Sequence, residues 1–164
     1  KEILSSNTLS NKNITFYCYD NDEEAIDFAK LALNNYKNIY LAKKNALRVA
    51  ATKSIESNKT KKCDFIYATG FFDYLPHKIS VRLVQNLKRL LMPDGVLAIS
   101  NVRDKYSNPS VHFMEWVGDW NLIYRTDDEF RQIFIGAGFK DNELKTQYEQ
   151  QGIMQYIFAA NTQR

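Results

Sequence analysis

Apolar runs alternate with amphipathic stretches along the chain. Four short apolar runs predict strands, at residues 14–19, 38–42, 64–69 and 96–100. The third run is almost wholly apolar, which is typical of a strand in a sheet that is covered on both faces. Two stretches between the runs carry their apolar residues on one helical face and predict helices, at residues 22–36 and 78–91.

The C-terminal part predicts a helix followed by a hairpin. Residues 126–129 are typical of a helix N-terminus, and the pair Ala137-Gly138 is typical of its end. Strands are predicted at 143–149 and 153–160, joined by a turn. The resulting order β-α-β-α-β-α-β-α-β-β indicates a parallel sheet with right-handed crossovers, to which the hairpin adds an antiparallel strand. We therefore expect an α/β fold and a single domain over residues 1–164.

A long segment, residues 101–125, is rich in aromatic residues. Its spacing from 111 to 125 predicts a helix with an apolar face that includes Trp120. An acidic pair, Glu115 and Asp119, lies four residues apart on another face, which favours either a polar wall of a site or a solvated surface. The aromatic face either caps an acyl-binding pocket or belongs to the core.

Composition and charge narrow the class of protein. The 164 residues are 45% apolar and 25% charged, which is ordinary for a globular domain, and the net charge of +3 is too small to indicate nucleic-acid binding. No run of eighteen apolar residues predicts a membrane span. Cys18 and Cys63 lie in predicted strands without metal-ligand or disulfide spacing, so we expect buried thiols, no metal and a cytoplasmic location.

Three local patterns resemble class I S-adenosylmethionine-dependent methyltransferases. The first predicted strand ends in an acidic residue, Asp20, and Asn45-Ala46-Leu47 follows the second. The turn Pro93-Asp94-Gly95 precedes the fourth and resembles the family's proline-glycine-glycine turn, from which it departs at Asp94. The resemblance implies a Rossmann-like, mostly parallel sheet with an antiparallel C-terminal hairpin strand.

Two longer motifs resemble a narrower subgroup, labelled 3-hydroxypalmitic acid methyl ester biosynthesis proteins. They are DFIYATGFFDYL at 64–75, and FMEWVGDW at 113–120 followed by LIYR at 122–125. The resemblance runs from about residue 14 to 160. It implies methyl transfer from S-adenosylmethionine to a small-molecule acceptor, such as a fatty-acid carboxylate that becomes a methyl ester.

The resemblance also implies a cofactor site. In the family, an acidic residue at the position of Asp20 accepts hydrogen bonds from the ribose hydroxyls, and Asn45 with Ala46 would lie beside the adenine. The alternatives from the residues alone are that Asp20 caps a helix and that Asn45 is an ordinary loop residue. The implied cofactor-binding residues are Asp20, Asn45, Ala46, Ala68, Thr69 and Gly70.

The expected catalytic residues are Asp73, Tyr74 and His112. A carboxylate acceptor needs no base, whereas a hydroxyl or amine acceptor does. Tyr74 follows the third predicted strand and either positions an acceptor oxygen or packs with the neighbouring phenylalanines. Arg125 pairs with a substrate carboxylate, or with an acidic neighbour, Asp119 or Glu129.

The family's first strand and its glycine-rich loop have no counterpart in residues 1–13. We therefore expect a fragment that lacks this strand and whose activity alone is doubtful. A competing interpretation is a non-catalytic methyltransferase-like domain used for regulation or dimerisation, and a homodimer stays open. A nucleotide-binding dehydrogenase is less favoured because G-x-G-x-x-G does not occur.

Overall fold

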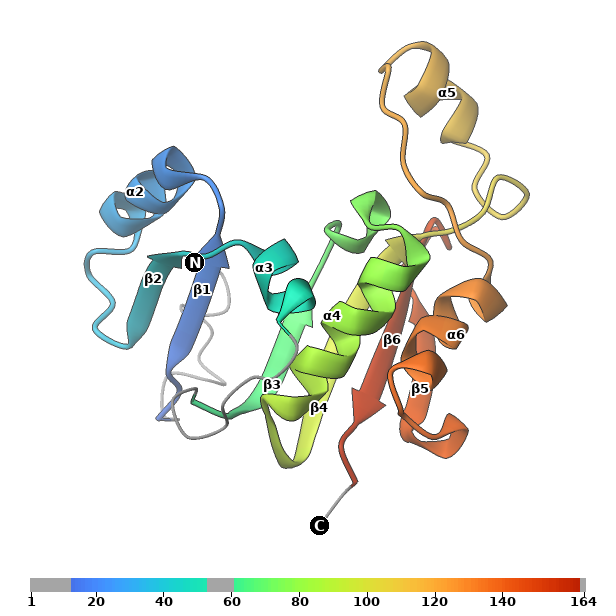
Figure 1. Cartoon of the computed structure of the whole chain (residues 1–164). Coiled ribbons are helices and arrows are strands. Elements are labelled where there is room, and N and C mark those ends of the chain that lie inside the picture. Colours follow the sequence, from blue (N-terminus) through green and yellow to red (C-terminus); the bar gives the residue numbers. More distant parts are fainter. Residues whose placement is uncertain (1–12, 53–60, 163–164) are drawn as a thin grey trace. The chain divides into compact units, whose positions relative to one another are not determined.

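The computed structural model describes residues 13–52 and 61–162 (Figure 1). The chain divides into two compact units, Lys1–Arg48 and Val49–Arg164. Each unit has a sheet of its own, with two strands in the first and four in the second. The prediction of a single domain over residues 1–164 stays a prediction.

The first unit is a β-α-β element. Strands β1 (Phe16–Asp20) and β2 (Ile39–Lys43) pair in parallel, and helix α2 (Glu23–Ala32) connects them. Asp22 is the N-cap of α2, because its carboxylate accepts a hydrogen bond from the amide of Glu24 at 2.9 Å. The helix ends four residues earlier than predicted, at a turn that contains two asparagines, which are weak helix formers.

The second unit has a four-stranded sheet in the order β3-β4-β6-β5. Its strands are β3 (Cys63–Ala68), β4 (Leu91–Val102), β5 (Leu144–Tyr148) and β6 (Met154–Ala160). Strands β3 and β4 are parallel, and β6 is antiparallel to both β4 and β5, which confirms the predicted hairpin. The helices and single helical turns are α3 (Ala46–Ala51), η1 (Phe72–Tyr74), α4 (His77–Arg89), α5 (Val111–Trp116), α6 (Asp127–Gly136) and η2 (Asp141–Glu143).

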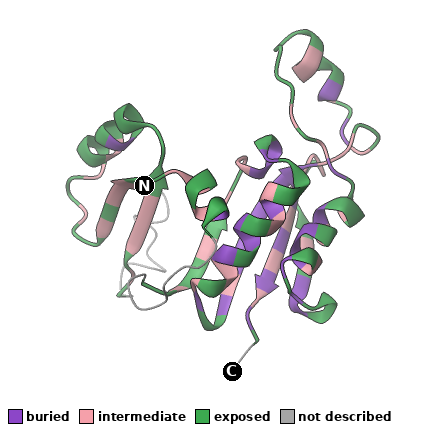
Figure 2. Cartoon of the chain, in the orientation of Figure 1, coloured by how far each residue is buried: buried purple, intermediate pink, exposed green. Residues whose placement is uncertain are grey.

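One face of this sheet carries the core. Helices α4 and α6 lie against it, whereas α5 stands away from the sheet (Figure 1). Figure 2 shows buried residues along α4, α6, β4 and β6, and the fully buried apolar residues on these elements include Val84, Leu97, Ile99, Phe130, Ile133, Phe134 and Ile157. Burial of each such side chain stabilises the fold by about 1.5–3 kcal/mol.

The opposite face is exposed at β3. Phe65 and Tyr67 alternate away from the core, stack at 5.9 Å between ring centroids, and are each more than half exposed. Among the described strands, β3 pairs only with β4, and β1 only with β2.

The predicted turn at 93–95 lies inside a longer strand than expected. Strand β4 begins at Leu91, which pairs with Cys63, and the register then shifts so that Phe65 pairs with Val96. Asp94 has a φ of 59°, and a Cβ on Gly95 would lie 2.9 Å from a backbone oxygen. The three residues therefore form a bulge that only a small residue at 95 permits.

The predicted helix from 111 to 125 is wrong beyond its first half. Helix α5 ends at Trp116, and Asp119 has a φ of 48°, outside the helical region. A side chain on Gly118 would come within 2.8 Å of the Met114 carbonyl oxygen, so glycine suits this close return of the chain. Glu115 and Asp119 therefore do not share a helix face.

Helix α6 confirms its predicted ends. Thr126 and Glu129 form a capping box, and Gly138 follows the helix with a φ of 90°. In the part of the chain that the structure describes, no helix combines the length and apolar character needed to cross a bilayer.

Candidate functional site

The nucleoside end of the predicted cofactor site lies in the first unit. Asp20 is the last residue of β1 and is exposed, and it pairs in register with Lys43 at the end of β2. One of its carboxylate oxygens accepts a hydrogen bond from the amide of Asp22 at 2.9 Å. Because Asp22 is itself the N-cap of α2, Asp20 is not the helix cap. Its second carboxylate oxygen has no partner among the described residues.

Asn45 lies at the same edge, two residues after β2. Its side-chain oxygen accepts a hydrogen bond from the amide of Leu47 at 2.8 Å, so it opens the helix that begins at Ala46. The side-chain NH₂ donates no hydrogen bond to another described residue. The hydrogen bond from Leu47 uses one lone pair of the Asn45 side-chain oxygen, as expected for a loop residue. The second lone pair and the NH₂ group have no partner among the described residues and are available to a ligand.

Residues 68–70 leave the carboxyl end of β3 in the second unit. Ala68 ends the strand, Thr69 follows it, and Gly70 has a φ of 72°, which favours glycine. The Gly70 amide donates a hydrogen bond to the hydroxyl of Ser100 on β4 at 3.1 Å. This bond fixes the direction in which the chain leaves the sheet.

Asp73 lies on η1, between β3 and α4, and is 4% exposed. One carboxylate oxygen accepts a hydrogen bond from the Val102 amide at 2.8 Å, and the other accepts none from the described residues. Burial raises the pKa of Asp73 from 3.8 to about 6, against the opposing effects of the Val102 amide and Arg125. A carboxylate with such a pKa is suited to take up a proton near neutral pH.

Tyr74 is the exposed member of the same turn. Its hydroxyl oxygen accepts a hydrogen bond from the indole nitrogen of Trp120 at 2.7 Å, and 53% of the residue is exposed. Phe71 and Phe72 pack edge to face on each other, and Phe72 is fully buried. Phe71 and Phe72 therefore pack on each other, which was the alternative role expected for Tyr74. The Tyr74 hydroxyl, in contrast, keeps a proton that it can donate.

His112 is not joined to these two residues. It lies exposed on α5, where its ring packs against Trp116 at 5.6 Å. No hydrogen bond connects it with Asp73 or Tyr74 in the described ranges. The structure thus brings two of the three expected catalytic residues together on one turn and leaves the role of His112 a prediction.

Arg125 has partners that the sequence did not reveal. It is 4% exposed, and its guanidinium donates hydrogen bonds to the backbone oxygens of Phe72 and Leu75 and to the side-chain oxygen of Asn101. Of the expected acidic neighbours, Glu129 attracts the guanidinium, but neither it nor Asp119 forms a salt bridge with Arg125 among the described residues, and pairing with a substrate carboxylate stays a prediction. The sequence signal for such partners was an arginine at the end of the apolar run at 122–125, because a buried cation requires several acceptors.

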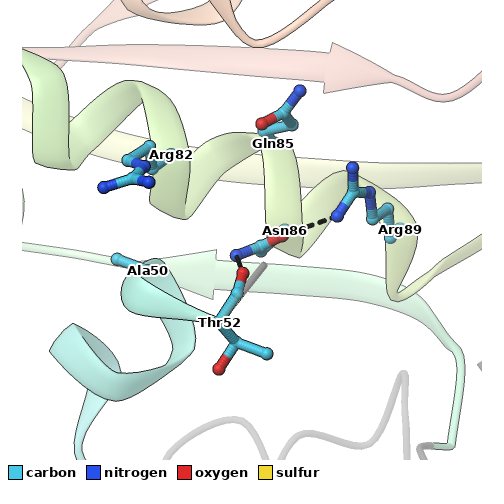
Figure 3. Close-up of a pocket in the computed structure, with 6 residues that line it drawn as sticks. All are labelled: Ala50, Thr52, Arg82, Gln85, Asn86 and Arg89. Carbon is cyan, nitrogen blue, oxygen red and sulfur yellow. Dashed lines mark hydrogen bonds between the residues drawn. The ribbon is translucent and has the colours of Figure 1, made fainter. Parts of the chain in front are cut away.

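A cavity of about 150 Å³ lies elsewhere in the second unit, between the end of α3 and α4 (Figure 3). The buried Asn86 donates hydrogen bonds to the backbone oxygens of Val49 and Thr52, at 2.7 and 3.0 Å, and accepts one from Arg89 at 3.1 Å. The cavity contains none of the expected site residues. Asn86 therefore satisfies the end of α3, which is a structural role.

Solved structures with the same fold include S-adenosylmethionine-dependent methyltransferases. The methyltransferase SibL, solved in its apo form, has a TM-score of 0.70 and 10% identity, over 92% of this chain and 44% of its own. Human N-acetylserotonin methyltransferase, solved in complex with S-adenosylmethionine, has a TM-score of 0.66 and 14% identity, over 94% and 43%. A Bordetella parapertussis protein, described as a possible exported protein, has a TM-score of 0.76 and 18% identity, over 99% and 58%.

These likenesses show an α/β, Rossmann-like class I methyltransferase fold, with a mostly parallel sheet and one antiparallel hairpin. The chain spans about half the length of these three structures. No protein-family model and no curated protein matches the sequence. The narrower 3-hydroxypalmitic acid methyl ester subgroup stays a prediction.

Proposed function

We propose that the natural protein containing this chain transfers a methyl group from S-adenosylmethionine to a small-molecule acceptor. The observation that carries the proposal is the turn after β3, which holds the buried Asp73 and the exposed Tyr74 as neighbours in the chain. In open α/β sheets, ligands bind outside the carboxyl ends of the strands, which is where this turn lies. A cytoplasmic location and a homodimer stay predictions.

The cofactor supplies the activated methyl group, so the protein mainly orients the acceptor. For the nucleoside end we propose the residues already placed at the carboxyl ends of β1 and β2. The free carboxylate oxygen of Asp20 would accept from a ribose hydroxyl, and Asn45 with Ala46 would contact the adenine. Ala68, Thr69 and Gly70 would line the cofactor at the end of β3.

Two kinds of acceptor place different demands on this turn. A fatty-acid carboxylate is already nucleophilic, so Tyr74 would only need to donate a hydrogen bond that orients it. A hydroxyl acceptor must lose a proton, and Asp73 is the group suited to receive it. We favour the carboxylate, with a methyl ester as product, and treat the hydroxyl as the measurable alternative.

One probe separates these products, because 3-hydroxypalmitic acid carries both groups. The natural full-length protein is incubated with this acid and with S-adenosylmethionine labelled in the methyl group. A methyl ester releases labelled methanol in mild base, whereas a methyl ether keeps its label. We expect base-labile label that depends on the protein.

A matched variant tests the role of Tyr74. Tyr74→Phe removes the hydroxyl but keeps the ring, and we expect it to raise KM for the acid while leaving the affinity for S-adenosylhomocysteine unchanged. Calorimetric titration of that ligand tests cofactor binding separately. Binding without any transfer would favour the non-catalytic interpretation, and absence of binding would refute the proposed function.

A further inference from the structure

The turn that carries Asp73 and Tyr74 is a single 3₁₀ turn with few backbone hydrogen bonds of its own. Within it, the amides of Tyr74 and Leu75 donate to oxygens three residues earlier, at 3.3 and 3.2 Å. Two such bonds do not fix a turn in one orientation. The Phe72 oxygen thus accepts from the Leu75 amide, and the Leu75 oxygen accepts from the Ser80 hydroxyl at 3.2 Å, so each keeps a second lone pair for a donor from outside the turn.

Arg125 supplies these donors. Its guanidinium bonds the backbone oxygens of Phe72 and Leu75, which are the residues on either side of Asp73 and Tyr74. A third bond goes to the side-chain oxygen of Asn101 on β4. The planar guanidinium therefore bonds the backbone on both sides of Asp73 and Tyr74 and links the turn to the end of a central strand.

Further bonds close this arrangement. The NH₂ group of Asn101 donates to the backbone oxygens of Val102 and Ile123, at 2.9 and 3.0 Å. The Ile123 amide donates to the backbone oxygen of Asp73 at 2.7 Å. The turn, the end of β4 and residues 123–125 are thus linked, and the side chains that link them, Asn101 and Arg125, are almost fully buried.

We propose that Arg125 is a positioning residue for methyl transfer, which holds the turn so that Tyr74 meets the acceptor. This inference rests on the proposed function. Arg125 acts through the turn and not on the substrate, because its guanidinium is buried and engaged with three acceptors. A lysine keeps the charge but presents a point donor, which does not satisfy the same three groups.

The test compares Arg125→Lys with Asn86→Ala in the natural full-length protein. Both changes remove hydrogen bonds from a buried side chain to backbone oxygens, but Asn86 lies between α3 and α4, away from the turn. The first readout is amide hydrogen exchange over residues 71–75. The second is steady-state kinetics with 3-hydroxypalmitic acid as the probe, well below the melting temperature of each variant.

We expect faster exchange over 71–75 in Arg125→Lys and not in Asn86→Ala. We also expect kcat to fall by about 10- to 100-fold in Arg125→Lys, the range for a reacting group misplaced by about 1 Å. KM for S-adenosylmethionine should change less than twofold. A purely structural role would lower kcat equally in variants with equal loss of melting temperature.

Unchanged exchange over 71–75 in Arg125→Lys would overturn the proposal, as would equal kcat losses in the two variants. If the wild-type protein does not methylate the probe, the proposed acceptor fails, and the exchange measurement still decides whether Arg125 holds the turn. Should Arg125→Lys not fold, Asn101→Ala removes one acceptor of the Arg125 guanidinium and is measured in its place.

Discussion

Asp73→Asn should stabilise the second unit at neutral pH. The amide oxygen of asparagine can still accept the hydrogen bond from the Val102 amide, which is 2.8 Å from the native carboxylate. The substitution removes a buried charge whose pKa rises from 3.8 to about 6, first because of desolvation. A rise of about two pH units corresponds to about 3 kcal/mol against the ionised form.

The direction follows from proton binding. Between pH 3.8 and about 6 the folded chain holds the Asp73 proton more firmly than the unfolded chain, so stability falls as the pH rises through this range. Above this pH range, the full free-energy cost of burying the ionised Asp73 carboxylate is present. The native neighbour Arg125 attracts the carboxylate and is lost as a partner in the variant, so we expect a net gain of about 1–3 kcal/mol at pH 7.5.

Urea denaturation followed by circular dichroism measures this difference. The advantage of Asp73→Asn over the native protein should shrink by about 2 kcal/mol when the pH is lowered from 7.5 to 4.5. Asp119→Asn, at an exposed position of the same unit, serves as the control and should not reproduce that trend. A variant that is destabilised equally at both pH values would refute the assignment of Asp73 as a destabilising buried acid.

Three further substitutions test other parts of the chain. Asn86→Ala should lower the free energy of unfolding by about 1–3 kcal/mol, because a buried amide loses its two hydrogen bonds to the backbone oxygens of Val49 and Thr52. Thr126→Ala should cost about 1 kcal/mol through loss of the capping box, measured in the same urea series. Asp20→Ala should weaken S-adenosylhomocysteine binding by about 1–3 kcal/mol in calorimetry, whereas Asp22→Ala, which removes only a helix cap, should not.

Regular elements were predictable from the sequence because their periodicity is local. The parallel pairs, the terminal hairpin and the ends of α6 all have their cause in residues close together along the chain, such as the box of Thr126 and Glu129. The position of Asp20 and Asn45 at one edge of the first unit was also predictable, whereas their role in binding a nucleoside stays a prediction. An acidic residue at the end of one strand and an amide after the next lie at one edge once the strands are parallel.

Residues 111–125 show where such reasoning fails. Their apolar spacing is helical, but Gly118 and Asp119 interrupt it, and the chain then returns to the sheet in an extended form. Arg125 pairs there beside Arg103. The helical spacing correctly predicted α5 but not the residues after it, because spacing alone does not reveal a residue in the left-handed region.

The polar side chains that shape the acceptor end follow from this return of the chain. Extended residues 123–125 reach the turn, and side chains add hydrogen bonds to backbone oxygens of both segments, at Phe72, Leu75 and Ile123. Asn101 and Arg125 donate these hydrogen bonds. Both lie in or beside apolar runs, whose periodicity depends only on the apolar residues and does not indicate a role for a polar one. A buried arginine costs free energy unless its donors find acceptors, and the Arg125 guanidinium has three of them, at Phe72, Leu75 and Asn101. The pattern of strands therefore has to be followed by a search for the acceptors of each buried polar side chain, which here leads to the turn that carries Asp73 and Tyr74.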